Sequence, residues 1–331
     1  MRTQSQDRAG SRATTLGKRA AVAVVGLSIA LVVAACGGGA DGAGDTGSSG
    51  GGTGDSAVPN TSAVLAAVKK DPKLAAELPA PIASAATIKL GSNLQSAPDN
   101  FYAADGRTPV GFEVDLAKAV ATELGVSVSY QDMPFGSLIT SLQSGRIDMT
   151  MAAMNDTKER QQKIDFVDYF QSGITIMVQS GNPDGIHGPG DLCGKTVAVD
   201  QGTSQETFAH QQGDTCVAAG KQTVTVTATD NDAQNQNQLR TGRVAAILND
   251  LPTAVYVSKT AGKGKYFQVV PGAPINGGPY GIGVNKDDPA LAKAVHDALA
   301  ALLADGTYGK ILAAWNVSQG ALTQVTENAG S

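Results

Sequence analysis

A stretch near the middle of the chain has a hydrophobic pattern that predicts a helix, a buried strand and a new helix start. Leu138 and Leu142 lie one helical turn apart, and Gly145 is a typical helix stop. Residues 147–154 form a short apolar run, which predicts a buried strand of a parallel sheet. The polar residues 155–160 then favour a helix N-terminus. A junction of strand end, backbone amides and an arginine can hold a small carboxylate.

The same order of elements recurs in the second half of the chain. Residues 239–250 repeat a Leu-x-Ser/Thr-Gly-Arg-Ile/Val pattern, followed by an apolar run and Asn-Asp. Strands and helices alternate around both copies, as they do in parallel sheets covered by helices. Two stretches rich in Gly and Pro, 179–189 and 271–279, interrupt the alternation and indicate crossovers. We predict an α/β fold whose chain leaves a first lobe, builds a second and returns, so that both lobes face one cleft.

The pattern assigns elements to most of the chain. Strands are predicted at residues 87–91, 126–130, 147–154, 174–178, 196–200, 223–228, 245–248, 267–270 and 280–284. Helices are predicted after residue 111, at 135–144, 205–211, 233–240, 252–260 and 289–304, and around Trp315. Before them, residues 61–85 are expected to form a short helical appendage in which Asp71 caps a turn that begins with Pro72.

Length and charge exclude some classes of protein. The 331 residues are enough for one large or two medium domains. The net charge is -5 with a pI near 5.2, and no run rich in Lys and Arg follows residue 19. This balance argues against nucleic acid as a partner. Nothing in the sequence predicts a cofactor or a metal site, and we expect a monomer.

The N-terminal residues have the pattern of an export signal. Basic residues end at Arg19, and an apolar run shorter than a membrane-spanning helix leads to Val33-Ala34-Ala35-Cys36. This ending resembles the bacterial lipobox, which implies that Cys36 is lipidated after residues 1–35 are removed. The alternative is an ordinary secretory signal with a chance cysteine. Residues 36–60 are rich in Gly, Ala and Ser and predict a flexible tether, so we expect an extracytoplasmic protein anchored by lipid to the outer face of the cell membrane.

Two further cysteines, Cys193 and Cys216, predict a disulfide, because an even pair in an exported chain usually forms one. The bond would close a loop of roughly 24 residues and contribute about 3 kcal/mol to stability on the chain-entropy account. Metal binding is the alternative, since His187 and His210 lie within range in the sequence, but no tight ligand spacing links them.

An ordered set of motifs resembles one known family. The matching segments are GFEVDLAKAVATELG (111–125), PFGSLITSLQSGRIDMTMA (134–152), DTKERQQKIDFVDYF (156–170), GKTVAVDQGTSQETF (194–208), GRVAAILNDLPTAVY (242–256), PYGIGV (279–284) and DPALAKAVHDALAALLADGTYGKILAAW (288–315). They resemble the family 3 extracellular solute-binding proteins, the amino-acid-binding subunits of polar amino acid ABC importers. The resemblance implies a two-lobed periplasmic-binding-protein-like fold with a two-strand hinge.

With this family in view, we expect lobe 1 at residues 86–178 and 279–331 and lobe 2 at residues 179–278. The resemblance also implies a function. The protein would capture a polar amino acid between its lobes and deliver it to a membrane permease, which works with ATPase subunits. Closure of the lobes would be favoured only by ligand contacts that exist in the closed state.

The resemblance carries over four residues that would hold the charged groups of the ligand. Arg160 is expected to bind the α-carboxylate, because a guanidinium can grip a carboxylate with two parallel hydrogen bonds. Asp250 is expected to bind the α-ammonium group. Ser204, with Thr203, matches the loop that donates to the carboxylate. The structural alternatives are an exposed helix-start arginine for Arg160 and plain helix caps for the other three.

Four more positions are implied with less direct roles. Asn155 stands where the family usually has Thr beside the carboxylate, and Ala153 would offer its backbone carbonyl to the ammonium group. Phe135 stands where an aromatic ring often flanks the ligand side chain, although it could equally belong to the core. Asn93 replaces the usual Asp of the first loop, and Ser96 replaces an aromatic residue there, so the side-chain pocket should differ from the usual one.

The identity of the ligand is the weakest part of the sequence evidence. Asp99, Asp156 and Asp250 near the expected cleft favour a basic amino acid. One alternative is an enzyme on the same scaffold, such as the periplasmic dehydratases, but none of the three histidines falls at a matched pocket position. A ligand-sensing receptor module is a further alternative. We do not favour it, because no signalling domain follows Ser331.

Overall fold

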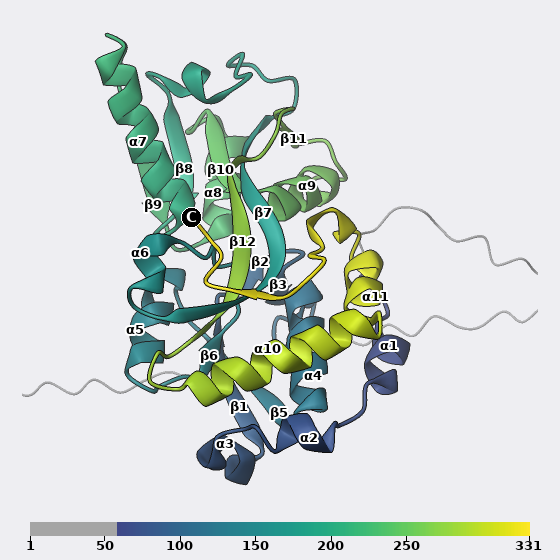
Figure 1. Cartoon of the computed structure of the whole chain (residues 1–331). Coiled ribbons are helices and arrows are strands. Elements are labelled where there is room, and N and C mark those ends of the chain that lie inside the picture. Colours follow the sequence, from purple (N-terminus) through teal and green to yellow (C-terminus); the bar gives the residue numbers. More distant parts are fainter. Residues whose placement is uncertain (1–57) are drawn as a thin grey trace, which may run out of the picture. The chain divides into compact units, whose positions relative to one another are not determined.

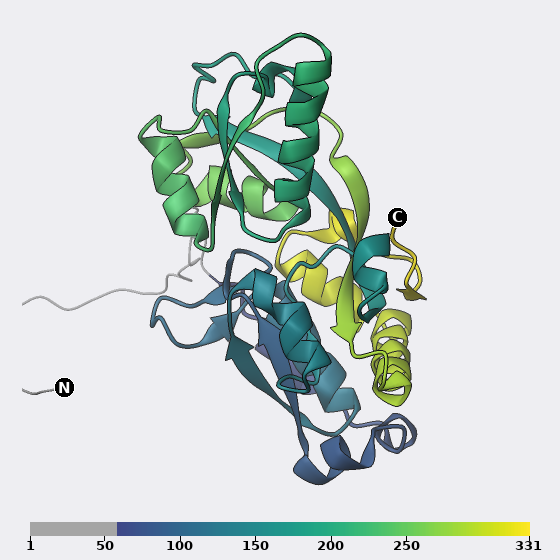
Figure 2. The same ribbon diagram turned by 90° about the vertical axis from the view of Figure 1, so that its left-hand side faces the viewer.

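The computed structural model describes residues 58–331. The predicted signal segment 1–35, the lipidation site Cys36 and the tether up to residue 57 lie outside the described residues. Within the described part, no helix combines the length and the apolar character needed to cross a membrane. The predicted two-lobed α/β fold is confirmed, and Figure 2 shows the two lobes joined by a pair of strands.

One mixed sheet runs through both lobes in the order β5-β1-β6-β12-β7-β10-β8-β9. Its strands are β1 (Thr87–Ser92), β5 (Ser127–Asp132), β6 (Met149–Thr150), β7 (Asp165–Gln179), β8 (Thr196–Asp200), β9 (Thr225–Thr229), β10 (Ala246–Asp250) and β12 (Ile275–Val284). Two short strands, β11 (Phe267–Val269) and β13 (Thr326–Glu327), also pair with β7. A separate small sheet contains β2 (Gln95–Ser96), β3 (Asn100–Tyr102) and β4 (Pro109–Val110).

The long antiparallel strands β7 and β12 connect the lobes, as Figure 1 shows. The first part of β7 buries Phe166 and Phe170 in lobe 1, whereas Ile176 and Val178 belong to the core of lobe 2. The sequence pattern predicts residues 174–178 in lobe 1 and a crossover at 179–189. This placement is wrong, because β7 is one unbroken strand whose second half already packs in the core of lobe 2, before the Gly- and Pro-rich segment begins.

Lobe 1 packs helices on both faces of its strands. Against one face lie α4 (Phe112–Glu123), α10 (Pro289–Ala304) and α11 (Thr307–Ala314), which share a core with Ile88 and Leu90. On the other face, α5 (Leu138–Gln143) packs with Ile147 and Phe166, next to the short 3-10 helix η1 (Phe135–Ser137). The apolar run predicted as a strand at 147–154 pairs only at Met149 and Thr150. It then turns at Ala153, whose φ is +48°.

Lobe 2 is covered in the same way, and its strands alternate between two cores. Val197 and Val199 face α7 (Ser204–Ala218), whereas Ala198 joins the cluster under α8 (Asp232–Arg240) and α9 (Leu251–Thr260). Burial on both faces explains why these strands are continuous apolar runs.

Helix α7 is longer than the predicted 205–211, because Gly213 stays helical. A Cβ at residue 213 would lie 2.7 Å from Thr223 Oγ1, so glycine permits close packing there.

The predicted disulfide joins Cys193 to Cys216, with Cα atoms 5.5 Å apart. Cys216 lies on α7, and Cys193 follows η2 (Pro189–Leu192) before β8. The bond therefore ties the last turns of α7 to the segment that enters the sheet of lobe 2.

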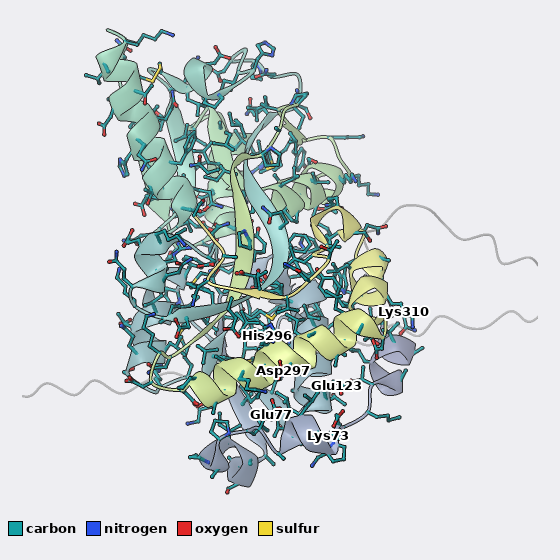
Figure 3. All side chains as sticks on the ribbon, viewed as in Figure 1. Lys73, Glu77, Glu123, His296, Asp297 and Lys310 are labelled. Carbon is teal, nitrogen blue, oxygen red and sulfur yellow. A yellow bond between two sulfur atoms is a disulfide. The ribbon has the colours of Figure 1, made fainter. Side chains whose placement is uncertain are left out.

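The predicted helical appendage packs on lobe 1 as α1 (Ser62–Ala67), α2 (Pro72–Ala75) and α3 (Ala80–Ala85). Asp71 caps α2 by accepting hydrogen bonds from the amides of Lys73 and Leu74. Leu78 and Ile82 are buried in the core of lobe 1. At the surface, Lys293 of α10 forms ion pairs with Asp297 of the same helix and with Glu77 of the appendage. Figure 3 labels Asp297 and Glu77, which lie on the two packed segments. Exposed pairs of this kind contribute little, so the apolar contacts hold the appendage.

We expect Ile82→Ala to lower the free energy of unfolding by about 2–5 kcal/mol, because the substitution leaves a cavity in the shared core. Urea denaturation followed by circular dichroism measures this loss. Val217→Ala is the control, since Val217 is 59% exposed and its truncation should change stability little. Equal effects of the two substitutions would show that the appendage is not part of the folded core.

Candidate functional site

A pocket lies where the two lobes meet. In this closed arrangement of the lobes it is narrow, with a cavity volume of about 40 Å³. The sequence-predicted residues that line it are Asn93, Phe135, Ala153, Asn155, Thr203 and Asp250. Arg160 and Ser204 line a neighbouring pocket, which shares Phe135, Asn155 and Thr203 with the first. The structure therefore brings all eight positions to one region, with six of them facing the same pocket.

Hydrogen bonds across the cleft hold the lobes closed. Two of them join predicted site residues: Arg160 Nη2 donates to Gly202 O at 3.2 Å, and Ser204 Oγ donates to Asn155 Oδ1 at 2.7 Å. Two more lie beside the pocket, from Gln95 Nε2 to Asp230 O at 2.8 Å and from Thr253 Oγ1 to Asp99 Oδ2 at 2.7 Å. Each bond joins a donor and an acceptor that separate when the lobes part.

Arg160 is held inside the cleft. It lies on α6 (Lys158–Gln161), whose N-cap Thr157 accepts a hydrogen bond from the Arg160 amide. Its guanidinium donates to Asn155 O at 2.9 Å and lies 5.3 Å from the centre of the Phe135 ring, a cation–π contact. Only 8% of Arg160 is exposed, so the alternative of an exposed helix-start arginine is wrong. Burial lowers the pKa of Arg160, and the charge of Asp250 opposes that shift.

Asp250 ends β10 and occupies the N-cap position of α9, but its side chain makes no capping hydrogen bond. Its Oδ1 atom is buried and accepts no hydrogen bond from the described residues. Burial raises the pKa of Asp250 to about 7, and the neighbouring side chains of Gln205 and Tyr280, together with the charge of Arg160, lower it in part. The plain capping role is therefore not supported, and an unpaired buried carboxylate oxygen is a natural acceptor for an ammonium group.

Thr203 and Ser204 divide the two roles that the sequence left open. Thr203 is the N-cap of α7: its hydroxyl accepts from the Glu206 amide and donates to Asp200 O. Ser204 is the first residue of that helix, and its hydroxyl crosses the cleft to Asn155. The N-terminus of this 15-residue helix therefore lies at the cleft, where the helix dipole favours negative charge.

The remaining predicted positions are fixed by their neighbours. The Ala153 amide donates to Glu113 Oε1 at 2.8 Å, and this bond holds the turn after β6. Asn155 forms a bridge with Tyr280 of β12, which ties this turn to the hinge. Asn93 is buried and its side-chain nitrogen donates to Met133 O at 3.2 Å. The turn and the first loop are thus both anchored in lobe 1.

Sequence reasoning missed two carboxylates of lobe 2 that line the pocket, Asp200 and Asp232. Burial, reinforced by the charges of Asp232 and Asp250, raises the pKa of Asp200 to about 8. Burial raises the pKa of Asp232 to about 6. Asp200 accepts a hydrogen bond from Asn235 at 2.8 Å. The signal was available, because Asp200 ends a predicted parallel strand, and ligands of α/β folds bind at such strand ends.

Two of the aspartates expected near the ligand side chain do not line this pocket. Asp99 is fully buried and bonds to Thr253. Asp156 accepts hydrogen bonds from Gln161 and from the amide of Gly330. The acidic character of the pocket therefore comes from Asp200, Asp232 and Asp250, whereas Asp99 and Asp156 lie near the cleft but outside this pocket.

The arrangement of lobes and pocket agrees with the comparison to known proteins. The family of bacterial extracellular solute-binding proteins, family 3, matches residues 88–318. The chain belongs to this family. The L-cystine-binding protein TcyJ of Escherichia coli (strain K12) is 33% identical over 230 residues, which cover 69% of this chain and 82% of that protein. The arginine-binding protein ArgT of Corynebacterium glutamicum is 28% identical over 258 residues, or 78% and 83% of the two chains.

Two solved structures extend the comparison of this solute-binding protein. An ancestral arginine-binding protein bound to arginine is 35% identical, with a TM-score of 0.64 over 70% of this chain and 98% of that chain. The ancestral amino acid-binding protein AncCDT-1, a precursor of cyclohexadienyl dehydratase, is 32% identical, with a TM-score of 0.63 over 71% of this chain and 97% of that chain. Both structures are of proteins whose names describe them as binding arginine or amino acids.

The raised pKa values give the ligand-free protein a testable pH dependence. Between pH 4 and pH 8 the folded state holds protons on Asp200 and its neighbours that the unfolded chain has lost, so their contribution to stability falls as pH rises. We expect Asp200→Asn to become progressively more stable than the wild type across this range, measured as melting temperature against pH.

The control for this series is Asp287→Asn, because Asp287 is exposed on the loop before α10. It should follow the wild-type curve at every pH. A difference between Asp200→Asn and the wild type that stays constant from pH 4 to pH 8 would contradict the assignment of a raised pKa to Asp200.

Proposed function

We propose that this solute-binding protein captures a basic amino acid in the cleft between its lobes, as the binding component of an ABC importer. The observation that carries the choice of ligand is the charge of the pocket. Three carboxylates of lobe 2, Asp200, Asp232 and Asp250, line one cavity. Arg160 of lobe 1 lines the neighbouring pocket, which shares the residues Phe135, Asn155 and Thr203 with that cavity. A zwitterion with a second positive charge matches this distribution.

In the proposed complex, the common part of the amino acid lies between Arg160 and Asp250. The guanidinium of Arg160 exchanges its bond to Gly202 O for the ligand α-carboxylate, with the α7 N-terminus and Ser204 as further donors. The unpaired Oδ1 of Asp250 accepts the α-ammonium group. Charged hydrogen bonds of this kind contribute about 1.5–3 kcal/mol each, so this handle would supply a large share of the binding energy.

The ligand side chain would extend toward Asp200 and Asp232. At neutral pH the two carboxyl groups together carry less than two negative charges, because burial and mutual repulsion raise their pKa values and favour protonation. A cationic ligand group removes that repulsion and is bound more strongly than a neutral one. Arginine binding by relatives named for it supports this class of ligand, although TcyJ is named for cystine.

The cellular context follows from the family and from the N-terminal sequence. Delivery to a membrane permease and its ATPase subunits is the role of this class of protein, and the predicted lipid anchor at Cys36 would keep the binding protein at the outer face of the membrane. The tether before Thr61 would leave the two lobes free to reach the permease.

We expect lysine, arginine, histidine or ornithine to raise the melting temperature in a thermal-shift screen of the twenty amino acids and related cations, because a ligand that binds only the folded state stabilises it.

Arg160→Ala should weaken binding by roughly 100-fold or more in calorimetry, through loss of two charged hydrogen bonds. Asp250→Asn should weaken it comparably. If no amino acid raises the melting temperature of protein freed of co-purified ligand, the proposed function is wrong.

We expect Asp200→Asn and Asp232→Asn each to reduce the preference for a basic over a neutral amino acid by about tenfold, which is the loss of one charged partner. Calorimetry with arginine and glutamine measures the ratio of the two affinities. Asp287→Asn, remote in sequence and exposed, should leave the ratio unchanged. A ratio that survives both pocket substitutions would rule out these carboxylates as the source of selectivity.

A dehydratase activity is the second candidate, and one observation favours it. A carboxyl group with a pKa near 8, such as Asp200, is protonated at neutral pH and could act as a general acid. AncCDT-1 is described as a precursor of such an enzyme. Incubation of the protein with cyclohexadienyl acids, followed by ultraviolet absorbance of an aromatic product, separates the two functions.

A further inference from the structure

The C-terminal segment of the chain, residues 321–331, follows a course that brings it back to the site. We call it the C-terminal strap. After η3 (Ser318–Gly320), it crosses the hinge strands and ends beside α6, as the yellow ribbon in Figure 1 shows. Its strand β13 pairs with β7, so that Thr326 lies opposite Asp168 and Glu327 opposite Val167. Asn328 then exchanges hydrogen bonds with the backbone of Phe166.

The last residues of the strap hold the turn that carries Arg160. The Gly330 amide donates to Asp156 Oδ2 at 2.7 Å, and Gly330 O accepts from Gln161 Nε2 at 3.1 Å. Gln161 Nε2 also donates to Asp156 Oδ1 at 2.8 Å. Gly330, Asp156 and Gln161 thus form a closed ring of hydrogen bonds around α6, directly next to Arg160.

The packing at Gly330 leaves no room for a side chain. A Cβ at this position would lie 1.8 Å from the backbone oxygen of Asp156, which is far inside contact distance. Gly330 is buried even though it is the next-to-last residue in the chain. The strap is therefore packed backbone against backbone on the turn, and any larger residue must displace it.

The turn needs outside support. Helix α6 has four residues, and a helix of that length has no stability of its own. Its arginine is nevertheless buried and aimed across the cleft at Gly202. The cap Thr157 fixes one end of α6, and the strap fixes Asp156 and Gln161 on its outer side. Few other contacts define the direction of the guanidinium, apart from Asn155 O and the Phe135 ring.

We propose that the C-terminal strap is a positioning element for the binding site, which holds the Asn155–Gln161 turn so that Arg160 meets the ligand carboxylate. The match to the family ends at residue 318, so the strap lies beyond the part of the chain that the family describes. The ligand role of Arg160 rests on the proposed function, whereas the hold of the strap on the turn does not. Gly330 and Gln161 act through Arg160 and touch no ligand themselves.

The test compares Gly330→Ala with the wild type in the full-length protein. The ligands are the amino acid that the thermal-shift screen identifies and its decarboxylated amine, for example arginine and agmatine. Loss of the Arg160 position should weaken amino acid binding by about tenfold, the value of one charged hydrogen bond, and leave amine binding within about twofold. A merely structural loss would weaken both ligands equally and would overturn the proposal.

A double-mutant cycle adds a second readout. In an Arg160→Ala background, Gly330→Ala should cause no further loss of amino acid affinity, because the group that the strap positions is gone. A loss that persists in this background overturns the proposal. Gln161→Leu removes the two hydrogen bonds that Gln161 contributes to the ring and adds no atom at residue 330. It should reproduce the loss of carboxylate discrimination if Gly330→Ala fails to fold. Gly309→Ala is the control, since a Cβ there meets no atom within 4 Å.

Hydrogen–deuterium exchange of the ligand-free proteins separates this proposal from the proposed function. The amides of residues 158–161 should exchange faster in Gly330→Ala than in the wild type and the Gly309→Ala control. If the wild type binds no amino acid, the proposed function fails, and faster exchange still supports the strap as the element that holds the turn. Unchanged exchange in that segment overturns the strap proposal whatever the ligand is.

Discussion

The antiparallel pairing of β7 with β12 is the constraint on which both lobes depend. Each strand contributes side chains to two cores, so neither lobe can form its sheet without the pair. Close packing limits the pair: a Cβ at Gly281 would lie 2.6 Å from the Phe166 ring, and one at Gly173 would lie 2.7 Å from Pro274. The pocket lies beside this link, because Asn155, which lines the pocket, pairs with Tyr280 of β12.

The two lobes bring different chemistry to that cleft. Lobe 1 supplies Arg160 on a short turn anchored to β12 through Asn155, and lobe 2 supplies carboxylates at the ends of β8 and β10. In the closed form Arg160 bonds to a backbone carbonyl of lobe 2, and Ser204 bonds back to Asn155. These bonds are of the kind that a zwitterionic ligand can replace with stronger, charge-assisted ones. Closure and recognition would then share the same atoms.

The ends of the described chain both strengthen lobe 1. The appendage buries Leu78 and Ile82 in its core, and the strap adds β13 to the side of β7. Lobe 2 is built from one continuous stretch of chain and carries the disulfide instead. The residues that face the cleft thus stand on two separately stabilised bodies, and the short turn with Arg160 is the part of the site with the least structure of its own.

Local sequence was sufficient for elements whose periodicity or caps are complete in themselves. Helix α10 spans Pro289–Ala304 as predicted, because its apolar positions repeat at helical spacing after an Asp288 cap. Asp71 caps α2 for the same local reason. The candidate positions Arg160 and Asp250 came from resemblance in motif order, and the two-lobed fold followed from the alternation of strands and helices.

The tertiary structure decided what depends on distant neighbours. The continuity of β7 arises from pairing with β12 and β10, whose residues lie far along the chain. Helix α7 continues through Gly213, where the close approach of Thr223 leaves no room for a side chain. Asp200 and Asp232 become pocket residues with raised pKa values only because parallel pairing gathers strand ends, and burial then penalises their charge. The sequence alone determined which segments could form the lobes; long-range packing and desolvation decided which side chains meet in the cleft.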